Sequence, residues 1–262
     1  MTYETILFEV DKAVARITLN RPDAANGLTL TMCEELHDAA VRCDHDPAIR
    51  AVLLTGTGRM FCAGGDIKFF QEAGDAVGAI VSRMTLALHG AVSVFNRMDA
   101  PVVVAVNGTA AGGGLSLAIS GDFVMTAETA KFTLAYTTAA LSPDGSSSWF
   151  LPRLVGLRRA KELMLTNRVL TAREAADYGM IDRVVADEDL PERALRQAEQ
   201  FATGPTGAYG AVKRLLAGSF EESLETQMAR EARHIAERLQ SPDGREGVAA
   251  FIDKRAPKFT GY

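Results

Sequence analysis

The sequence predicts an α/β fold followed by a helical C-terminal region. Up to residue 185, short apolar segments that resemble strands alternate with helical patterns, as in folds built from strand–helix–strand units with right-handed crossovers. Two glycine-rich segments each follow a predicted strand, and from residue 205 onward only helical patterns occur. We therefore divide the chain into an α/β core, residues 1–200, and a helical part, residues 201–262.

The N-terminal elements follow from residue type and spacing. Residues 5–9 and 14–19 have the composition of two strands and predict a hairpin around Asp11-Lys12. Apolar residues repeat at helical spacing from 29 to 43, behind a capping threonine, and predict a helix. Short strands are expected at 51–54 and 60–62, and the second leads directly into the first glycine segment.

The later elements are predicted in the same way. A continuous β-branched run at 101–106 is typical of a strand covered on both faces. Because a helical end of this kind often packs on a neighbouring subunit, we expect an oligomer. The other predicted elements are helices at about 75–97 and at 115–120, strands at 122–126 and 181–185, and helices at 205–216, 221–239 and 242–253.

Composition limits the classes of function. The chain has 262 residues, 47% of them hydrophobic, which is enough to bury a substantial core. Its net charge of −5 does not suggest a nucleic-acid-binding surface. The number of cysteines is odd and no CxxC motif occurs, which is typical of a reduced cytosolic protein; the three are Cys33, Cys43 and Cys62. With no secretory signal and no uninterrupted apolar run of about 18 residues, we expect a cytoplasmic protein that binds neither nucleic acid nor membrane.

The strongest local signal is a pair of glycine-rich segments, 61–67 (FCAGGDI) and 107–115 (NGTAAGGGL). Glycine lets a backbone approach a ligand closely, and a helix start leaves N–H groups without intrahelical partners. Two such groups converging on one point would form an oxyanion hole. Spacing alone leaves two alternatives open, phosphate binding and close packing, although neither segment matches a dinucleotide or P-loop motif. Asp66 is expected to orient the turn and Cys62 to be a packing residue.

These segments resemble the signature of the crotonase (enoyl-CoA hydratase/isomerase) superfamily. The likeness covers essentially the whole chain, including 20–28 (NRPDAANGL), 151–156 (LPRLVG), 175–181 (AADYGMI) and 251–255 (FIDKR). It implies a spiral of ββα repeats, a helical trimerisation region, and trimers that often pair into hexamers. It also implies a coenzyme A thioester as substrate, no metal or redox cofactor, and an oxyanion hole made by the N–H groups of Gly65 and Gly113.

The residues around this hole indicate which reaction is catalysed. Hydratases of the superfamily use two glutamates, and the matching positions hold Ser116 and Tyr136, which are poor replacements near pH 7. Asp144, in a Pro-Asp-Gly segment, resembles the acid/base of the enoyl-CoA isomerases and 1,2-epoxyphenylacetyl-CoA isomerases. We therefore predict isomerisation of a 3-enoyl-CoA, or of a related ring-derived thioester, to the 2-enoyl form. By residue type alone, an N-cap of the next helix explains Asp144 at least as well.

Other activities remain as alternatives. In 4-chlorobenzoyl-CoA dehalogenase a histidine occupies the place of His89 and a nucleophilic aspartate that of Asp144, and residues 158–168 resemble that enzyme. Its pocket, however, has aromatic residues where this chain has Gly65 and Tyr136. A lone helical histidine is more typical of a surface or packing residue. Hydration, thioester hydrolysis and a non-catalytic acyl-CoA-binding relic are the further alternatives, and the retained glycines and aspartate argue against the relic.

Coenzyme A carries phosphates, so cations are expected near its nucleotide end. Arg21 is one candidate and Lys254, from a neighbouring subunit, is another, although each is equally typical of a solvated surface cation. The resemblance places the pantetheine and adenine groups against the backbone around Ala24, Asn26 and Ala63.

Overall fold

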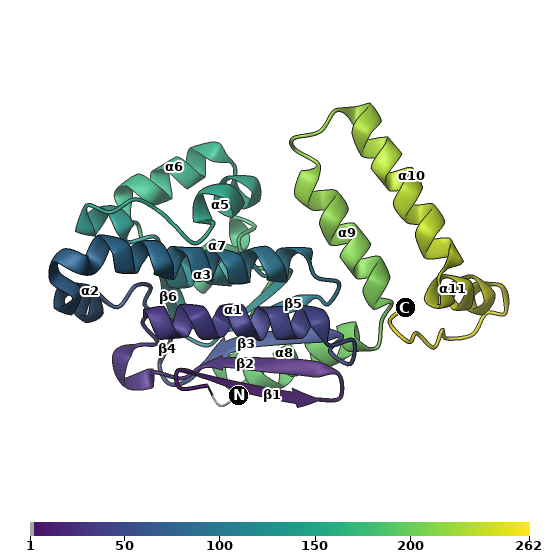
Figure 1. The fold of residues 1–262 in the computed structure, drawn as a ribbon, viewed down its shortest axis with the longest axis horizontal. Helices are drawn as coiled ribbons and strands as arrows, with labels where there is room; N and C mark the ends of the chain where they lie inside the picture. The colour runs from purple at the N-terminus through teal and green to yellow at the C-terminus, as the bar shows by residue number, and fades with distance from the viewer. Residues whose placement is uncertain (1–2) are drawn as a thin grey trace.

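The structure, a computed structural model, describes residues 3–262 and has the spiral arrangement of strand–strand–helix repeats (Figure 1). In three consecutive repeats the first strand joins a six-stranded sheet and the second joins a four-stranded sheet, whereas both strands of the N-terminal hairpin join the six-stranded sheet. Thus β3, β5 and β7 belong to the large sheet, and β4, β6 and β8 belong to the small one. The expected α/β spiral with a helical C-terminal region is confirmed.

The large sheet has the strand order β1-β2-β3-β5-β7-β10. β1 and β2 form the expected antiparallel hairpin, which turns at Lys12 and Ala13, and the other neighbouring strands are parallel. β5 is buried throughout, as expected for a parallel strand covered on both faces. The strands are β1 (Ile6–Asp11), β2 (Val14–Leu19), β3 (Ala51–Gly56), β5 (Val102–Val106), β7 (Phe123–Ala127) and β10 (Arg183–Val185).

The small sheet has the order β4-β6-β8-β9. Because β4, β6 and β8 are parallel, their carboxyl ends meet at one edge, and the residues that follow them lie together. Gly65, Gly113 and Tyr136 each come shortly after one of these strands. The strands are β4 (Met60–Cys62), β6 (Thr109–Ala111), β8 (Lys131–Thr133) and the antiparallel β9 (Leu170–Thr171).

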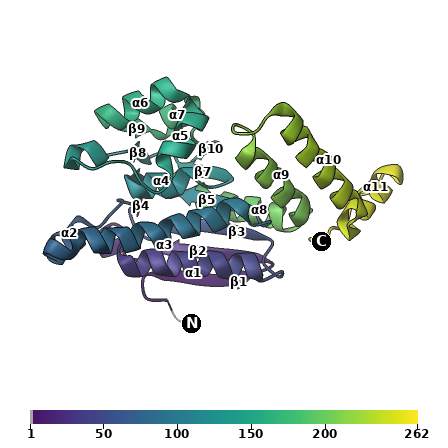
Figure 2. The same cartoon turned by 45° about the horizontal axis from the view of Figure 1, so that its top comes forward.

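Two long helices, α1 (Leu30–His45) and α3 (Val77–Arg97), lie side by side in both ribbon views (Figures 1 and 2). Thr29 caps α1, because its side chain accepts a hydrogen bond from the N–H of Met32 at 3.3 Å. On the large sheet, α8 packs against β3 and β5. The other helices of this part are α2 (Ile67–Ala73), α4 (Gly113–Ile119), α5 (Ser147–Val155), α6 (Leu157–Thr166), α7 (Ala172–Asp177) and α8 (Leu190–Ala202).

The C-terminal helices α9 (Thr206–Gly218), α10 (Leu224–Gln240) and α11 (Pro242–Ile252) project to one side of the sheets (Figure 1). Lys213 attaches α9 to the core, with its ammonium 2.7 Å from the carboxylate of Asp122. No residue of α10 is buried. Large apolar side chains are exposed along these helices: Leu216, Phe220, Leu224, Met228, Ile235, Leu239, Val248, Phe251 and Ile252.

Among the short elements, α2, β6 and β9 were not predicted from the sequence. β6 lies inside the second glycine segment and β9 has two residues, so neither is long enough to give a periodic pattern. α2 begins after Asp66 because the Asp66 side chain accepts hydrogen bonds from the N–H groups of Lys68 and Phe69.

The segment Ile67–Arg97 is long and apolar enough, by length and composition alone, to cross a membrane. Polar and charged residues interrupt it, so it contains no uninterrupted apolar run of about 18 residues. Its most apolar window has a mean hydropathy of 1.4, and 28% of that window is buried. In the fold, α3 packs on α1, and apolar residues of the segment line the cavity described next.

Candidate active site

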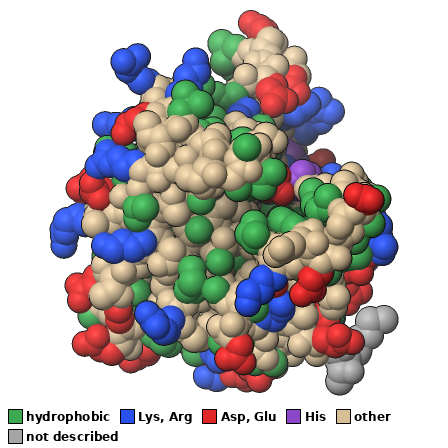
Figure 3. All heavy atoms as spheres, turned by 90° about the vertical axis from the view of Figure 1, so that its left-hand side faces the viewer, with side chains coloured by type: hydrophobic (Ala, Val, Ile, Leu, Met, Phe, Trp, Pro, Cys, Tyr) green, Lys and Arg blue, Asp and Glu red, His purple; other side chains and the backbone are tan. Residues whose placement is uncertain are grey.

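A cavity of about 580 Å³ lies where the carboxyl ends of the small-sheet strands meet α1, α2 and α3. Seen onto the α2 end of the molecule, apolar side chains gather in the middle of the face and charged ones surround them (Figure 3). Among the residues that the structure describes, Asp144 is the only carboxylate that lines the cavity. The apolar wall includes Leu28, Phe70, Val77, Val81, Met84, Leu88, Leu134 and Leu141.

Two left-handed glycines bring the glycine segments together. Gly64 has a φ of +89° and Gly112 a φ of +50°, a region that other residues rarely adopt. A Cβ atom added at Gly64 would lie 2.8 Å from the carbonyl oxygen of Ala111 and 3.1 Å from the nitrogen of Gly113. A larger residue at position 64 would therefore push the two segments apart.

The N–H groups of Gly65 and Gly113 are left without acceptors. Gly65 forms a bridge with Leu28, but the hydrogen bonds of that bridge are made by Gly64 and Asp66, at 2.8 and 3.0 Å. Gly113 is the first residue of α4, where an N–H has no intrahelical partner. Neither group has an acceptor within residues 3–262, and both glycines line the cavity. The structure thus brings together the two donors that the sequence suggested.

Asp144 faces these donors. A Cβ atom built on Gly113 would lie 3.8 Å from Oδ1 of Asp144. The alternative that this carboxylate caps α5 is wrong, because Ser146 is the N-cap residue and no side chain caps the helix. Only the carbonyl of Asp144 contacts α5, accepting hydrogen bonds from the N–H and hydroxyl of Ser147 at 3.2 and 3.1 Å. The carboxylate is therefore free to face the cavity.

Tyr136 and Ser116, which the resemblance aligns with the glutamates of hydratases, form a hydrogen-bonded chain that ends on Asp144. The Tyr136 hydroxyl donates to Oδ1 of Asp144 at 2.6 Å, and the Ser116 hydroxyl lies 3.0 Å from the phenolic oxygen. Burial, followed by the charge and hydrogen bond of Asp144, raises the pKa of Tyr136 far above its ordinary value. The phenol therefore keeps its proton, and neither it nor the fully buried Ser116 can replace a glutamate as a base.

His89 contacts the loop that carries Asp144. Its Nε2 atom accepts a hydrogen bond from the N–H of Gly145 at 3.1 Å, which requires a neutral imidazole with its proton on Nδ1. His89 is not among the described residues that line the cavity. It is therefore not oriented to activate a water beside a substrate.

The guanidinium of Arg21 is already engaged within the protein. It lies 3.0 Å from the carboxylate of Asp66 and donates to the carbonyl of Gly27. Burial by itself would raise the pKa of Asp66, but hydrogen bonds from the Phe69 N–H and from Arg21 outweigh burial and lower it. A phosphate at Arg21 would therefore have to compete with an existing ion pair, and Asp66 orients the turn as expected.

Asn26 supports the same turn from inside. It is fully buried, and its carboxamide oxygen accepts a hydrogen bond from the N–H of Arg21 at 2.8 Å. Its amide nitrogen donates to the carbonyls of Thr57, Met60 and Phe61. The Asn26 side chain therefore holds the backbone that was expected to contact coenzyme A and does not itself reach a ligand.

Of the other predicted contact residues, Ala24 and Ala63 lie in neighbouring segments, because the N–H of Ala63 donates to the carbonyl of Ala25 at 3.0 Å. Ala63 lines the cavity, and Ala24 lies in the short helical turn Pro22–Ala24. Lys254 is exposed beyond the end of α11, on the helices that project from the core (Figure 1). Cys62 donates its thiol hydrogen to the carbonyl of Asn26 at 3.1 Å, and burial raises its pKa to about 12, as suits a packing residue.

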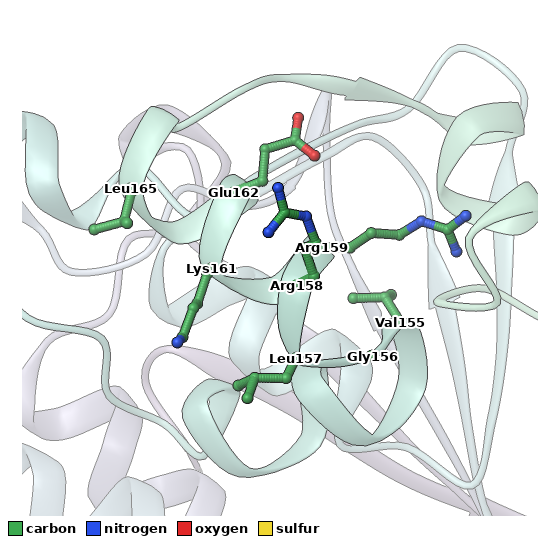
Figure 4. A pocket seen from close by; sticks show the side chains of 8 residues that line it. All are labelled: Val155, Gly156, Leu157, Arg158, Arg159, Lys161, Glu162 and Leu165. Carbon is green, nitrogen blue, oxygen red and sulfur yellow. The ribbon is translucent and has the colours of Figure 1, made fainter.

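A second hollow, of about 940 Å³, lies on the surface at α5 and α6. Arg158, Arg159, Lys161 and Glu162 line it, and the side chains drawn there point in different directions (Figure 4). The guanidinium of Arg159 lies 4.6 Å from the ring centre of Tyr178. Because no set of groups converges here, we place the active site in the first cavity, where two N–H groups and a carboxylate do.

The hydrogen bonds that link Ser116 and Tyr136 to Asp144 were missed by sequence reasoning. Tyr136 precedes Asp144 by eight residues across a short 3₁₀ turn and an irregular loop, a stretch without periodicity. The only available signal was that two glutamates are replaced while one aspartate is retained. That signal does not show that the replacements contact the aspartate.

The chain is similar to known proteins over nearly its whole length. Residues 9–262 match the family model described as Enoyl-CoA hydratase/isomerase. The 1,2-epoxyphenylacetyl-CoA isomerase of Escherichia coli (strain K12) is 40% identical over 262 residues, which cover 98% of this chain and 99% of that protein. A "Probable enoyl-CoA hydratase" of Rhodobacter capsulatus is 39% identical over 261 residues, with 100% of both chains covered. The crystal structure of an enoyl-CoA hydratase from Polaromonas sp. JS666 has a TM-score of 0.92 at 32% identity, covering 97% of this chain and 99% of that one. The chain belongs to the enoyl-CoA hydratase/isomerase family of the crotonase superfamily.

Proposed function

We propose that the protein is an enoyl-CoA isomerase that converts a 3-enoyl-CoA, or a related ring-derived thioester, into the conjugated 2-enoyl form with a single aspartate. One observation carries the proposal: the carboxylate of Asp144 faces the free N–H groups of Gly65 and Gly113 in an apolar cavity to which the described residues contribute no second carboxylate. Two convergent donors suit the oxygen of a thioester enolate, and one carboxylate suits a proton that moves between nearby carbons.

The proposed reaction begins with the thioester oxygen accepting hydrogen bonds from Gly65 and Gly113. Asp144 removes a proton from C2, the electron pair of that C–H bond forms a C1–C2 double bond, and negative charge moves onto the thioester oxygen. The two N–H groups stabilise this charge. When the pair on oxygen returns, the double bond forms between C2 and C3, and the former C3–C4 pair takes the proton from Asp144 at C4. Atoms and charge balance, as an isomerisation requires.

Hydration requires two acid–base groups, more than this cavity provides. A water must lose a proton to one group while a carbon receives a proton from another. Tyr136 keeps its proton because its pKa is raised, and Ser116 is buried beneath it. These contacts support isomerisation over hydration, although relatives carry both names.

Dehalogenation would use Asp144 as a nucleophile and His89 as the base that activates water. The lone pair of His89 Nε2 already accepts the N–H of Gly145, outside the cavity lining. This arrangement favours isomerisation over dehalogenation.

We also propose that α9, α10 and α11 pack on neighbouring copies, as a homotrimer or a pair of trimers. The exposed apolar side chains of these helices support this assembly, because a lone chain would leave them in water. The same packing would bring Lys254 towards the coenzyme A of a neighbour. Sedimentation at micromolar concentration is expected to give the mass of three or six chains, and a persistent monomer would refute the assembly.

Product analysis tests the proposed activity. Purified protein is incubated with 3-hexenoyl-CoA, crotonyl-CoA and 4-chlorobenzoyl-CoA in separate reactions in D₂O, and the products are identified by mass spectrometry. Conversion of 3-hexenoyl-CoA to the conjugated isomer, with little addition of water to crotonyl-CoA, is the expected result. Rapid hydration, loss of chloride, release of free coenzyme A, or binding without any turnover would each overturn it.

A further inference from the structure

The direction of the hydrogen bonds around Asp144 can be worked out from the groups present. An ionised carboxylate only accepts, so the Tyr136 hydroxyl must donate its one proton to Oδ1, at 2.6 Å. The phenolic oxygen then has no second proton to give. At the 3.0 Å contact between Ser116 and Tyr136, only the serine can then be the donor, and its oxygen has a second, longer contact with the carbonyl oxygen of Gly112 at 3.3 Å. The chain runs in one direction, from Ser116 through Tyr136 to Asp144.

The two carboxylate oxygens of Asp144 consequently differ. Oδ1 is held by Tyr136, whereas Oδ2 accepts no hydrogen bond from any residue between 3 and 262, and Asp144 lines the cavity. One oxygen is anchored and the other is left for the substrate. A carboxylate held in this way cannot swing freely about its side-chain torsions, which keeps the free oxygen aimed at one place.

The size of Ser116 also sets the position of the loop. A Cβ atom built on Gly145, whose φ is +59°, would lie only 2.8 Å from Cβ of Ser116. The loop that carries Asp144 therefore packs directly against position 116. A longer side chain there would occupy the space of the loop and displace Asp144 from the oxyanion donors.

We propose that Tyr136 is a positioning residue that anchors Oδ1 of Asp144, and that Ser116 holds the phenol in place while leaving room for the loop. The proposal rests on Asp144 being the base, as proposed above. In this arrangement Ser116 and Tyr136, at the positions of the hydratase glutamates, support Asp144 as the one carboxylate that carries out the reaction. Tyr136 also stabilises the ionised carboxylate, because a hydrogen bond to a charged acceptor favours the charged form.

The substitution Tyr136→Phe tests this role, with the rate of 3-hexenoyl-CoA isomerisation followed across pH. We expect kcat to fall about ten-fold with little change in KM, because the loss of one charge-assisted hydrogen bond has roughly this effect. A hydrogen bond to a charged acceptor favours the charged form, so the acid limb of the rate profile should move to higher pH when the donor is removed. Ser116→Ala should produce a smaller shift in the same direction.

Other titrating groups near the carboxylate must be separated from this effect. The thiol of Cys33, on α1, stays protonated over the assay range, because burial, with smaller contributions from Cys62, Asp144 and Glu34, raises its pKa to about 12. His89, on α3, contacts Gly145 next to Asp144. The comparison is therefore repeated with His89→Gln present in both proteins, since the amide oxygen of glutamine can accept the same N–H without titrating.

The chain offers a matched control. The hydroxyl of Tyr3 donates to a carboxylate oxygen of Asp38 at 2.7 Å, far from the cavity, so Tyr3→Phe removes the same kind of hydrogen bond elsewhere. It should leave both kcat and the pH profile unchanged. Acyl-CoA affinity and melting temperature establish that each variant is folded.

The outcomes distinguish the two proposals. If Asp144→Asn is inactive but Tyr136→Phe and Ser116→Ala reproduce the wild-type rate and profile, the positioning role is wrong and the base assignment stands. A lower kcat in Tyr136→Phe with an unmoved acid limb also counts against the proposal, because a purely structural defect would produce it. If Asp144→Asn keeps the wild-type rate, the proposed function itself fails.

Discussion

Replacing Gly113 by proline should delete one oxyanion donor with little other change. Gly113 is the first residue of α4, a position where helices tolerate proline because its N–H has no intrahelical acceptor. The new Cβ would lie 3.0 Å from Cδ1 of Leu28. Because this atom is the end of a flexible side chain, it can move aside. Gly113→Ala adds a Cβ at the same place and keeps the N–H. The comparison of the two variants therefore separates the effect of the added Cβ from the effect of replacing the N–H hydrogen by the proline Cδ.

The size of the effect follows from the two donors that the site provides. Removal of one oxyanion donor typically lowers kcat by about 100- to 1000-fold, or about 2.7–4 kcal/mol of transition-state energy. Because Gly65 still donates, we expect a reduced rate and not a complete loss. Substrate affinity should fall as well, because the proline Cδ takes the place of the N–H hydrogen beside the thioester oxygen.

The assay is the initial rate of conjugation of 3-hexenoyl-CoA over a range of concentrations, with melting temperature measured for each variant. We predict that Gly113→Pro is at least about 100-fold slower than Gly113→Ala in kcat. Equal kcat values in two folded variants would refute the reasoning, because the N–H of Gly113 would then contribute nothing to the reaction.

Other predictions concern stability and the loop of Asp144. Lys213→Met should lower the free energy of unfolding by about 2 kcal/mol, because it leaves the partly buried carboxylate of Asp122 with the Val102 N–H but without its cation. Lys12→Met, at an exposed pair, should cost less than about 1 kcal/mol, and similar losses in urea denaturation would contradict this. Hydrogen bonds from Arg255 and from the Lys258 N–H lower the pKa of Glu246 from 4.5 to about 2. Glu246→Gln should therefore melt at a lower temperature than wild type above pH 4.5, and the difference in melting temperature should disappear as the pH falls towards 2. A difference that stays constant with pH would count against this prediction. Gly145→Ala should reduce kcat and melting temperature together. The left-handed φ of Gly145 is strained for alanine, and the added Cβ would lie 2.8 Å from Cβ of Ser116. Wild-type kinetics would show that the loop has more room than the structure indicates.

Much of the fold follows from local pattern. The hairpin of β1 and β2, the fully buried β5, and the helices α1, α3, α9, α10 and α11 all carry a clear period or a continuous apolar run, and they form close to the predicted ranges. β6 and β9 could not be predicted, because two or three residues carry no period and their pairing is decided by strands distant in sequence.

The candidate site also has features with a local sequence signal and contacts that no local signal predicts. The glycine segments between a strand and a helix gave a local signal, but Gly65 and Gly113 were identified as the donors only by the resemblance to the crotonase superfamily. The role of Asp144 was ambiguous, since an aspartate before a helix is also a typical cap, and only the loop geometry shows that Ser146 occupies that position. The engagement of Arg21 by Asp66, and of Asp144 by Tyr136, joins residues from different elements, and no one-dimensional pattern records such contacts.

The central claim is that one carboxylate, Asp144, both takes the proton from C2 and delivers one to C4. The measurement that tests it most directly is ¹H NMR of 3-hexenoyl-CoA in D₂O with wild type and Asp144→Asn, following exchange at C2 and hydrogen delivery at C4 in the same sample. The account predicts that both rates fall together, by about 100- to 10,000-fold, the range typical of losing a general acid–base. Conjugation by Asp144→Asn at the wild-type rate, or the loss of delivery at C4 while exchange at C2 continues, would contradict it.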